Sequence, residues 1–483
     1  MVRVILVILF LATLGLNVYR AYTQSLTVDE AFSYLSFIAP NRAEAFAHYD
    51  ANNHVLNTWL GRAAVRRFGP SEIVLRLPSL LGGALYLFVV LRLSEWMFGA
   101  GLQAILSFIA LSANPILLEY LSAARGYSLG LGFEFLAIWL IAWSLSVEPT
   151  TNRRWRNIAA GVSLALSGAG NLVFVIPNLV LIAAFVFLAA RTFPKPNWRR
   201  VGKSFVEIAA PGLAVFAMLM YWPLAHASAS NFYIGEQSFQ RSAEILLVRS
   251  FNHPVVYWGH RFSGPLRWMA APAILLALLL LSLIAVKGRS FSPTKLWPAP
   301  LIAPLTLVGS LAALVTLHLL IGFPYPYERT GLYFIPLATL TILEAAGVGL
   351  RLPALRIPAI LLYFYLCFAA VEYLLELRVD RYKEWASDAG TKRVVTLLAE
   401  MNKPATGPKR LAVSWGFEYS VNYYRKILGL DWLAPVDRTD PLSRSFDYYY
   451  LKPDDRSIVD TLKLSVLYTD PVSEAVLAAP TQR

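Results

Sequence analysis

The chain of 483 residues is 57% hydrophobic and 15% charged, with a mean hydropathy of +0.52. This composition excludes a soluble globular protein and indicates a membrane protein with several spans. The net charge of +13 would also suit a nucleic-acid-binding protein. However, most of the excess lies in short loops between apolar segments, so we expect the lipid bilayer and no nucleic acid as a partner. The single cysteine, Cys367, excludes a disulfide framework and a thiolate metal site.

The apolar segments predict about eleven transmembrane helices. The first, residues 3–19, follows one arginine and lacks a small-residue cleavage site, so we interpret it as a retained helix rather than a signal peptide. Residues 157–190 are too long for one helix and break at GAGN, so they count as two spans. The other segments that can cross the hydrocarbon layer are 77–97, 101–118, 127–147, 205–222, 266–286, 299–320, 330–350 and 356–375.

Basic residues are concentrated on one side of the predicted spans. If the N-terminus is cytoplasmic, four loops on that side hold thirteen Arg and Lys against one acid, Glu148. These loops are 148–156, 191–203, 287–298 and 351–356. Because cytoplasmic loops carry an excess of Arg and Lys, we expect a protein of the inner membrane with a cytoplasmic N-terminus.

The outer side then receives two long loops and the C-terminal tail. Loops 20–76 and 223–265 have amphipathic spacing, which predicts helices lying in the membrane interface. In the tail, helix-like TKRVVTLLAEM and EYSVNYYRKILGL alternate with strand-like RLAVSW and FDYYYL. The sequence therefore predicts an all-α membrane bundle over 1–375 and a small extracytoplasmic α/β domain over 376–483.

Two adjacent carboxylates, Asp29 and Glu30, follow the first span. In Thr27-Val28-Asp29-Glu30, Thr27 suits the N-cap of a helix and Glu30 the third helical position of a capping box. Asp29 is favoured there by the helix dipole. The local sequence therefore leaves open whether these acids serve the helix end or a reaction.

Other motifs follow the acid pair in a fixed order. They are DANNHVLNTWL at 50–60, SEIVLRLPSLLGG at 71–83, SAARGYSLGLGF at 122–133, PYPYERTGLYFIP at 324–336 and DRYKEW at 380–385. Together with TVDEAFSY at 27–34, this order resembles the GT-C membrane glycosyltransferases, in the bacterial branch of the protein O-mannosyltransferase and aminoarabinose transferase superfamily. The order and spacing carry the resemblance, which covers most of the chain. Val55 departs from the pattern, because the family usually has proline there.

The resemblance implies an inverting glycosyltransferase that moves a monosaccharide from a polyprenyl-phosphate donor to a glycan or glycolipid acceptor of the cell envelope. It makes Asp29 and Glu30 the catalytic pair, with Asp29 as the base and Glu30 largely occupied with its own helix end. Glu30→Gln would then keep the cap and much of the activity. Because a phosphate is already a good leaving group, one base and several cations should suffice.

Outer-side residues that suit the donor phosphate are His54, Arg125, Arg329, Tyr127, Tyr325 and Tyr327, and Asp50 and Asn53 suit positioning of the acceptor. Several of these residues have a structural alternative. His54 can cap a helix, Arg125 can reach the headgroups, Arg329 can pair with Glu328, and Asp50 can form a turn.

No metal or other cofactor is expected, because the chain has one clear acidic motif and because His253 and His260 lack a metal-ligand spacing. A transporter or flippase of a lipid-linked sugar is the alternative function. Such proteins usually show inverted repeats and broken helices, whereas the polar motifs here gather in outer loops. A relative that binds a glycolipid without catalysis also stays open.

Overall fold

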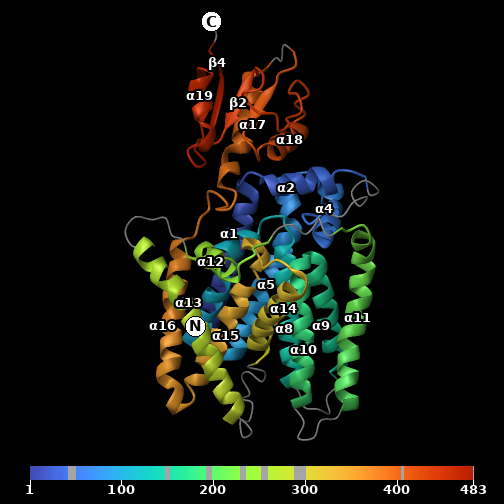
Figure 1. The fold of residues 1–483 in the computed structure, drawn as a ribbon, viewed down its shortest axis with the longest axis vertical. Coiled ribbons are helices and arrows are strands. Elements are labelled where there is room, and N and C mark those ends of the chain that lie inside the picture. Colours follow the sequence, from blue (N-terminus) through green and yellow to red (C-terminus); the bar gives the residue numbers. More distant parts are fainter. Residues whose placement is uncertain are drawn as a thin grey trace.

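The computed structural model describes residues 1–41, 50–146, 153–191, 198–228, 235–251, 259–287, 301–403 and 407–481. Long helices form a bundle, and a small α/β domain lies beyond one of its ends (Figure 1). In these residues nine helices are long and apolar enough to cross a membrane. Six of them are α1 (Val2–Thr23), α5 (Glu72–Phe98), α8 (Tyr127–Ser146), α11 (Trp198–Ala225), α13 (Gly259–Lys287) and α14 (Ile302–Ile321). The other three reach this length together with the short turn that precedes each helix: α10 (Val175–Arg191) with the turn from Leu172, α15 (Phe334–Gly349) with the turn from Glu328, and α16 (Arg356–Leu375) with the turn from Pro353. The chain is therefore a multi-pass membrane protein.

Two of the eleven predicted spans form shorter helices. Residues 101–118 divide into α6 (Leu102–Ser112) and α7 (Pro115–Tyr120). The Asn114 side chain caps α7, and Pro115 has no N–H with which to continue α6. Residues 157–170 belong to α9 (Arg154–Gly170), whose 17 residues span about 25 Å, less than the roughly 30 Å of a hydrocarbon core.

Small residues let the central helices approach closely. A Cβ atom on Gly82 of α5 would lie 2.6 Å from the backbone nitrogen of Leu129 on α8. A Cβ atom on Gly212 of α11 would lie 2.8 Å from the carbonyl oxygen of Gly161 on α9. Backbone packing of this kind is typical of membrane helices. The ends of α8 and α9 also meet closely, because a Cβ atom on Gly170 would lie 3.0 Å from the backbone nitrogen of Gly130.

The outer loops contain helices, as the amphipathic spacing predicts. Residues 20–76 form α2 (Val28–Ser33), which continues as the π-helix η1 (Tyr34–Ile38), and then α4 (Val55–Phe68). Both α2 and α4 lie at the end of the bundle that faces the α/β domain (Figure 1). Loop 223–265 contributes α12 (Phe239–Ser250). Short 3-10 turns precede three spans: η2 (Leu172–Phe174), η5 (Glu328–Gly331) and η6 (Pro353–Leu355).

The tail after α16 forms a mixed four-stranded sheet with helices. The sheet order is β1-β2-β4-β3, with β1 and β2 parallel and the other pairs antiparallel. The strands are β1 (Leu411–Val413), β2 (Tyr448–Leu451), β3 (Leu464–Thr469) and β4 (Val476–Pro480). The helices and turns are η7 (Ala386–Gly390), α17 (Thr391–Met401), α18 (Glu418–Ile427), η8 (Pro453–Asp455) and α19 (Ser457–Thr461). The two predicted helices and two predicted strands are confirmed, whereas β3 and β4 were not predicted.

The tail shares a hydrophobic core with the outer loops. Val395 of α17 and Val421 of α18 belong to the same buried cluster as Leu26 and Ala31 at the start of α2. Because this cluster is continuous, the α/β domain is packed onto the residues that carry the acid pair.

Candidate active site

The helix that carries Asp29 begins with the predicted capping box. Glu30 N donates to Thr27 Oγ1 at 3.3 Å, and Thr27 N donates to Glu30 Oε2 at 2.9 Å. This reciprocal pair satisfies two amides of the first turn. It fixes the backbone of Asp29, which lies between the two.

Glu30 is a structural residue and does not face the open site, which corrects its prediction as a catalytic residue. Its side chain has no exposed surface and forms a two-point ion pair with Arg76, from Nε to Oε1 at 2.8 Å and from the terminal nitrogen to Oε2 at 2.6 Å. Ala124 N also donates to Oε1. Four N–H groups therefore donate to its two oxygens, and neither oxygen can accept a further hydrogen bond from a substrate.

Asp29 lies between two arginines. Its Oδ2 atom is 3.3 Å from Arg329 and 3.7 Å from Arg125. Although Oδ2 is enclosed, no donor in the described part of the chain hydrogen-bonds to it. Burial raises the pKa of Asp29, but Arg125, Arg329 and a hydrogen bond from Trp385 outweigh it and hold the pKa below its usual value. Asp29 is therefore an ionised carboxylate with an oxygen available to a hydroxyl group.

Arg125 joins three segments around Asp29. It donates to Asn52 Oδ1 at 2.7 Å and to Ser33 Oγ at 3.1 Å. The next residue, Gly126, has φ +69°, and a Cβ atom there would lie 2.7 Å from the Cβ of His54. Only glycine fits this turn. Arg125 is thus held against α2 and does not reach lipid headgroups.

Arg329 reaches Asp29 from the loop before α15. The predicted alternative, a pair with Glu328, does not form, because Glu328 pairs with Arg249 of α12. Glu328 has φ +47°, an uncommon conformation for a residue with a side chain. Arg329 instead pairs with Glu384, which also accepts the hydroxyl of Tyr120. The loop conformation therefore points the two neighbouring charges to different partners.

His54 and Tyr127 lie beside the arginines. Their rings meet edge-on with centroids 5.5 Å apart. Burial, reinforced by Arg125 and Arg329, holds the pKa of His54 well below its usual value. His54 is therefore neutral near pH 7, and it can offer a substrate a hydrogen bond but no positive charge.

The neutral state of His54 makes stability depend on pH. A lowered pKa means that the unfolded state binds the proton first, at about pH 6.5. Stability is then complete above that pH and falls below it by up to about 1.4 kcal/mol per pH unit. We expect His54 to contribute a fall in the melting temperature in detergent between about pH 6.5 and 5, and His54→Gln to remove that contribution. The exposed His226 provides the control His226→Gln. If the fall is equally steep in both variants, His54 is not its source.

Four of the predicted site residues have other roles. Tyr325 pairs with Glu236 through its backbone and stacks on His318, and Tyr327 is the N-cap residue of η5. Asp50 forms a turn by accepting Asn52 N, and Asn53 accepts the hydroxyl of Thr58. No contact that we observe brings these side chains to Asp29. Asn52, between Asp50 and Asn53 in the chain, is the residue of this turn that reaches Arg125.

Three residues of the cluster were not predicted as site residues. Tyr120 lies in α7, and Glu384 and Trp385 lie in the DRYKEW segment. That segment carries part of the family resemblance, so the sequence could have indicated Glu384 and Trp385 as site residues. Among the described residues, no group of three or more His, Cys, Asp or Glu side chains could hold a metal ion. The absence of a metal requirement stays a prediction.

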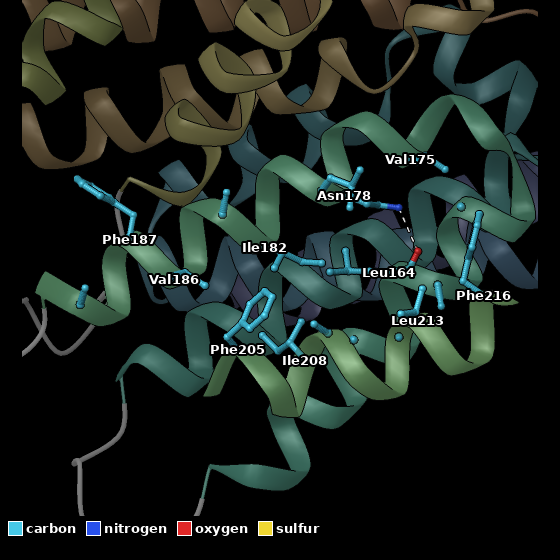
Figure 2. Close-up of a pocket in the computed structure, with 18 of the residues that line it drawn as sticks. Leu164, Val175, Asn178, Ile182, Val186, Phe187, Phe205, Ile208, Leu213 and Phe216 are labelled. Atoms are coloured by element: carbon cyan, nitrogen blue, oxygen red, sulfur yellow. Dashed lines mark hydrogen bonds between the residues drawn. The ribbon is translucent and has the colours of Figure 1, made fainter. Parts of the chain in front are cut away.

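An apolar cavity lies between α9, α10 and α11 (Figure 2). Its volume is about 1010 Å³, and its walls are apolar side chains and glycines apart from Asn178. Asn178 donates to the carbonyl of Leu164, as Figure 2 shows. At one end the lining includes Gly168, two residues before Gly170, which packs on Gly126 beside His54. This end of the cavity is therefore the end towards the charged cluster.

Bundle, outer helices and α/β domain together form the GT-C fold. The chain is similar to the crystal structure of ArnT from Cupriavidus metallidurans in the apo state, with a TM-score of 0.51, 14% identity and 98% of both chains covered. The same protein bound to undecaprenyl phosphate gives a TM-score of 0.49 at 15% identity, with 98% of both chains covered. The Archaeoglobus fulgidus oligosaccharyltransferase with Zn and sulfate gives 0.48 at 12% identity, covering 99% of this chain and 73% of that one. Neither a family model nor a curated protein matches the sequence.

Proposed function

We propose that the protein is an inverting glycosyltransferase, which moves a monosaccharide from a polyprenyl-phosphate donor to a cell-envelope acceptor at the outer face of the inner membrane. The observation that carries this proposal is the ionised Asp29, which lies between two arginines and whose enclosed Oδ2 atom receives no hydrogen bond from any residue that the structure describes. The shared fold with ArnT supports it. A glycan or glycolipid of the envelope is the acceptor class.

In the proposed reaction, an acceptor hydroxyl attacks the anomeric carbon from the side opposite to the phosphate. The new C–O bond forms as the bond to the phosphate oxygen breaks, so the configuration inverts. Asp29 takes the hydroxyl proton, and the phosphate leaves with the bonding electron pair. Arg125 and Arg329 stabilise the negative charge that develops on the phosphate.

Asp29 is a weak base while both arginines face it, because they lower its pKa. A bound phosphate competes for the same two guanidinium groups, and each arginine then stabilises the Asp29 carboxylate less. Donor binding therefore raises the proton affinity of Asp29 at the moment when the base is needed. Positioning of the hydroxyl supplies the rest of the rate.

The apolar cavity supports a lipid-linked donor. A polyprenyl chain contains no polar groups, and it gains free energy from contact with an apolar lining. Leu179 and Leu213 of this lining are strongly exposed towards the surrounding lipid. A chain lying there would place its phosphate near His54, Arg125 and Arg329.

Arg329→Gln should weaken transfer at the donor step. Loss of a charge-assisted hydrogen bond costs about 1.5–3 kcal/mol, which corresponds to about 10–150-fold in kcat/KM. We expect KM for the donor to rise and Arg329→Lys to recover part of the loss. The exposed Arg241 supplies the control Arg241→Gln, which should match the wild type. Equal donor kinetics in Arg329→Gln and the control would remove Arg329 from the site.

Mass spectrometry of envelope glycans tests the function and identifies the substrates. A strain that lacks the protein should lose one sugar residue from one glycan or glycolipid, and the wild-type gene should restore it. That missing residue would name the donor sugar and the acceptor together. An unchanged glycan profile would contradict the proposal.

A further inference from the structure

The residues that lead into α2 are held by the C-terminal domain. Leu26 N donates to the hydroxyl of Tyr424 at 2.7 Å, and Val28 N donates to Asp388 Oδ2 at 2.8 Å. The hydroxyl of Ser25 donates to the carbonyl of Ala389 at 2.7 Å. Three anchors within four residues therefore connect this segment to residues more than 350 positions away.

These anchors matter because α2 is only six residues long and remains short even with the five-residue π-helix η1 that continues it. A helix of this length does not form without external partners, since nucleation is unfavourable and the first amides have no partner within the helix. Thr27 satisfies the amide of Glu30, but the first helical amide, Val28 N, depends on Asp388. Asp29 is the next residue along the same turn.

Asp388 also connects α2 to α18. Its second oxygen, Oδ1, accepts the hydroxyl of Ser420 at 3.0 Å. Asp388 as a whole residue is 2% exposed, so water cannot reach its carboxyl group to replace either partner. Any change at Asp388 is therefore transmitted to the first turn of α2.

We propose that Asp388 is a positioning residue for the reaction, which holds the first turn of α2 through Val28 N and so sets the place of Asp29. The proposal rests on the proposed function, in which Asp29 is the base. Asp388 itself does not touch the substrate. Through Asp388, the C-terminal domain helps to position the catalytic base.

The charge state of Asp388 adds a second readout. Burial raises the pKa of Asp388 to about 7, although hydrogen bonds from Val28 and Ser420 and the charge of Lys452 lower it. Asp29 raises the pKa further, and the hydroxyl of Tyr450 also faces the group. Once ionised, Asp388 binds Val28 N more strongly and raises the proton affinity of Asp29. Activity should therefore rise as the pH increases through about 7.

Asp388→Ala and Asp388→Asn separate the hydrogen bond from the charge. Alanine leaves Val28 N without an acceptor. Asparagine keeps an acceptor for Val28 N, and its amide can donate to Ser420, whose hydroxyl is also within reach of the Phe417 carbonyl. The exposed Asp431 provides the control Asp431→Ala.

The experiment measures two quantities in the full-length protein in proteoliposomes. One is sugar transfer, with lipids extracted from the native membrane as the source of donor and acceptor. The other is hydrogen–deuterium exchange of residues 26–33. At about pH 6, where Asp388 is mostly protonated, alanine should lower kcat by about 10–100-fold and speed exchange, whereas asparagine should match the control. The asparagine variant should also lose the rise in activity through about pH 7.

Wild-type exchange in Asp388→Ala would overturn the proposal, and so would equal impairment of the alanine and asparagine variants. If the wild-type protein transfers no sugar, the proposed function fails. The exchange comparison then still decides whether Asp388 holds α2.

Discussion

Asp29→Asn is expected to lower kcat for sugar transfer by about 10²–10⁴-fold, the usual contribution of a general base. The amide cannot accept a proton from the acceptor hydroxyl. Because the asparagine side chain is uncharged, it no longer competes with the phosphate for Arg125 and Arg329, so KM for the donor should stay equal or fall. The measurement is the rate of transfer by the purified variant, together with recovery of the missing sugar in a strain that lacks the protein.

Asp50→Asn is the matched control, because it is the same chemical change in the same outer loop. Asparagine at this position still accepts the amide of Asn52, so the turn is kept. This variant should transfer sugar at the wild-type rate. An Asp29→Asn protein that is as active as Asp50→Asn would show that Asp29 is not the base.

The largest effect on stability is expected from Glu30→Gln, which should lower the free energy of unfolding by about 3–5 kcal/mol. The amide cannot balance the guanidinium charge of Arg76, which is fully buried. It also places an NH₂ group where the native carboxylate accepts hydrogen bonds from N–H groups. Activity should fall with stability, since Glu30 closes the capping box that fixes Asp29. This differs from the expectation from sequence that Glu30→Gln keeps much of the activity.

Thermal unfolding in detergent measures this effect. The control is Glu400→Gln, at a half-exposed position that pairs with Arg393 at 3.9 Å, and it should change stability by less than about 0.5 kcal/mol. Equal melting temperatures for the two variants would mean that the Glu30–Arg76 pair does not stabilise the fold.

The sequence predicted features that depend on neighbouring residues. The capping box needs only Thr27 and Glu30, and both hydrogen bonds are present. Hydrophobic length predicted nine of the spans, because a membrane helix must be long and apolar. The family resemblance placed Asp29, Arg125 and Arg329 in one site, and the structure brings them together.

Features that depend on long-range contacts were not predicted. Glu384 and Asp388 each act on a segment far away in the chain, and no local pattern encodes those partners. Arg76, the partner of Glu30, lies inside an apolar run. A charged residue is unusual there, so Arg76 could have been noticed from the sequence. The neutral state of His54 arises from its burial beside two arginines, which residue type alone does not reveal.

The most direct test of the central claim follows the sugar itself. Purified wild-type protein and Asp29→Asn are each placed in proteoliposomes with lipids extracted from the native membrane, and the lipids are analysed by mass spectrometry. We predict that the wild-type protein removes a monosaccharide from its polyprenyl-phosphate carrier and that the same mass appears on a second lipid or glycan, whereas Asp29→Asn leaves both unchanged. Polyprenyl-phosphate sugars that stay unchanged with the wild-type protein, or that are consumed equally by Asp29→Asn, would contradict the account.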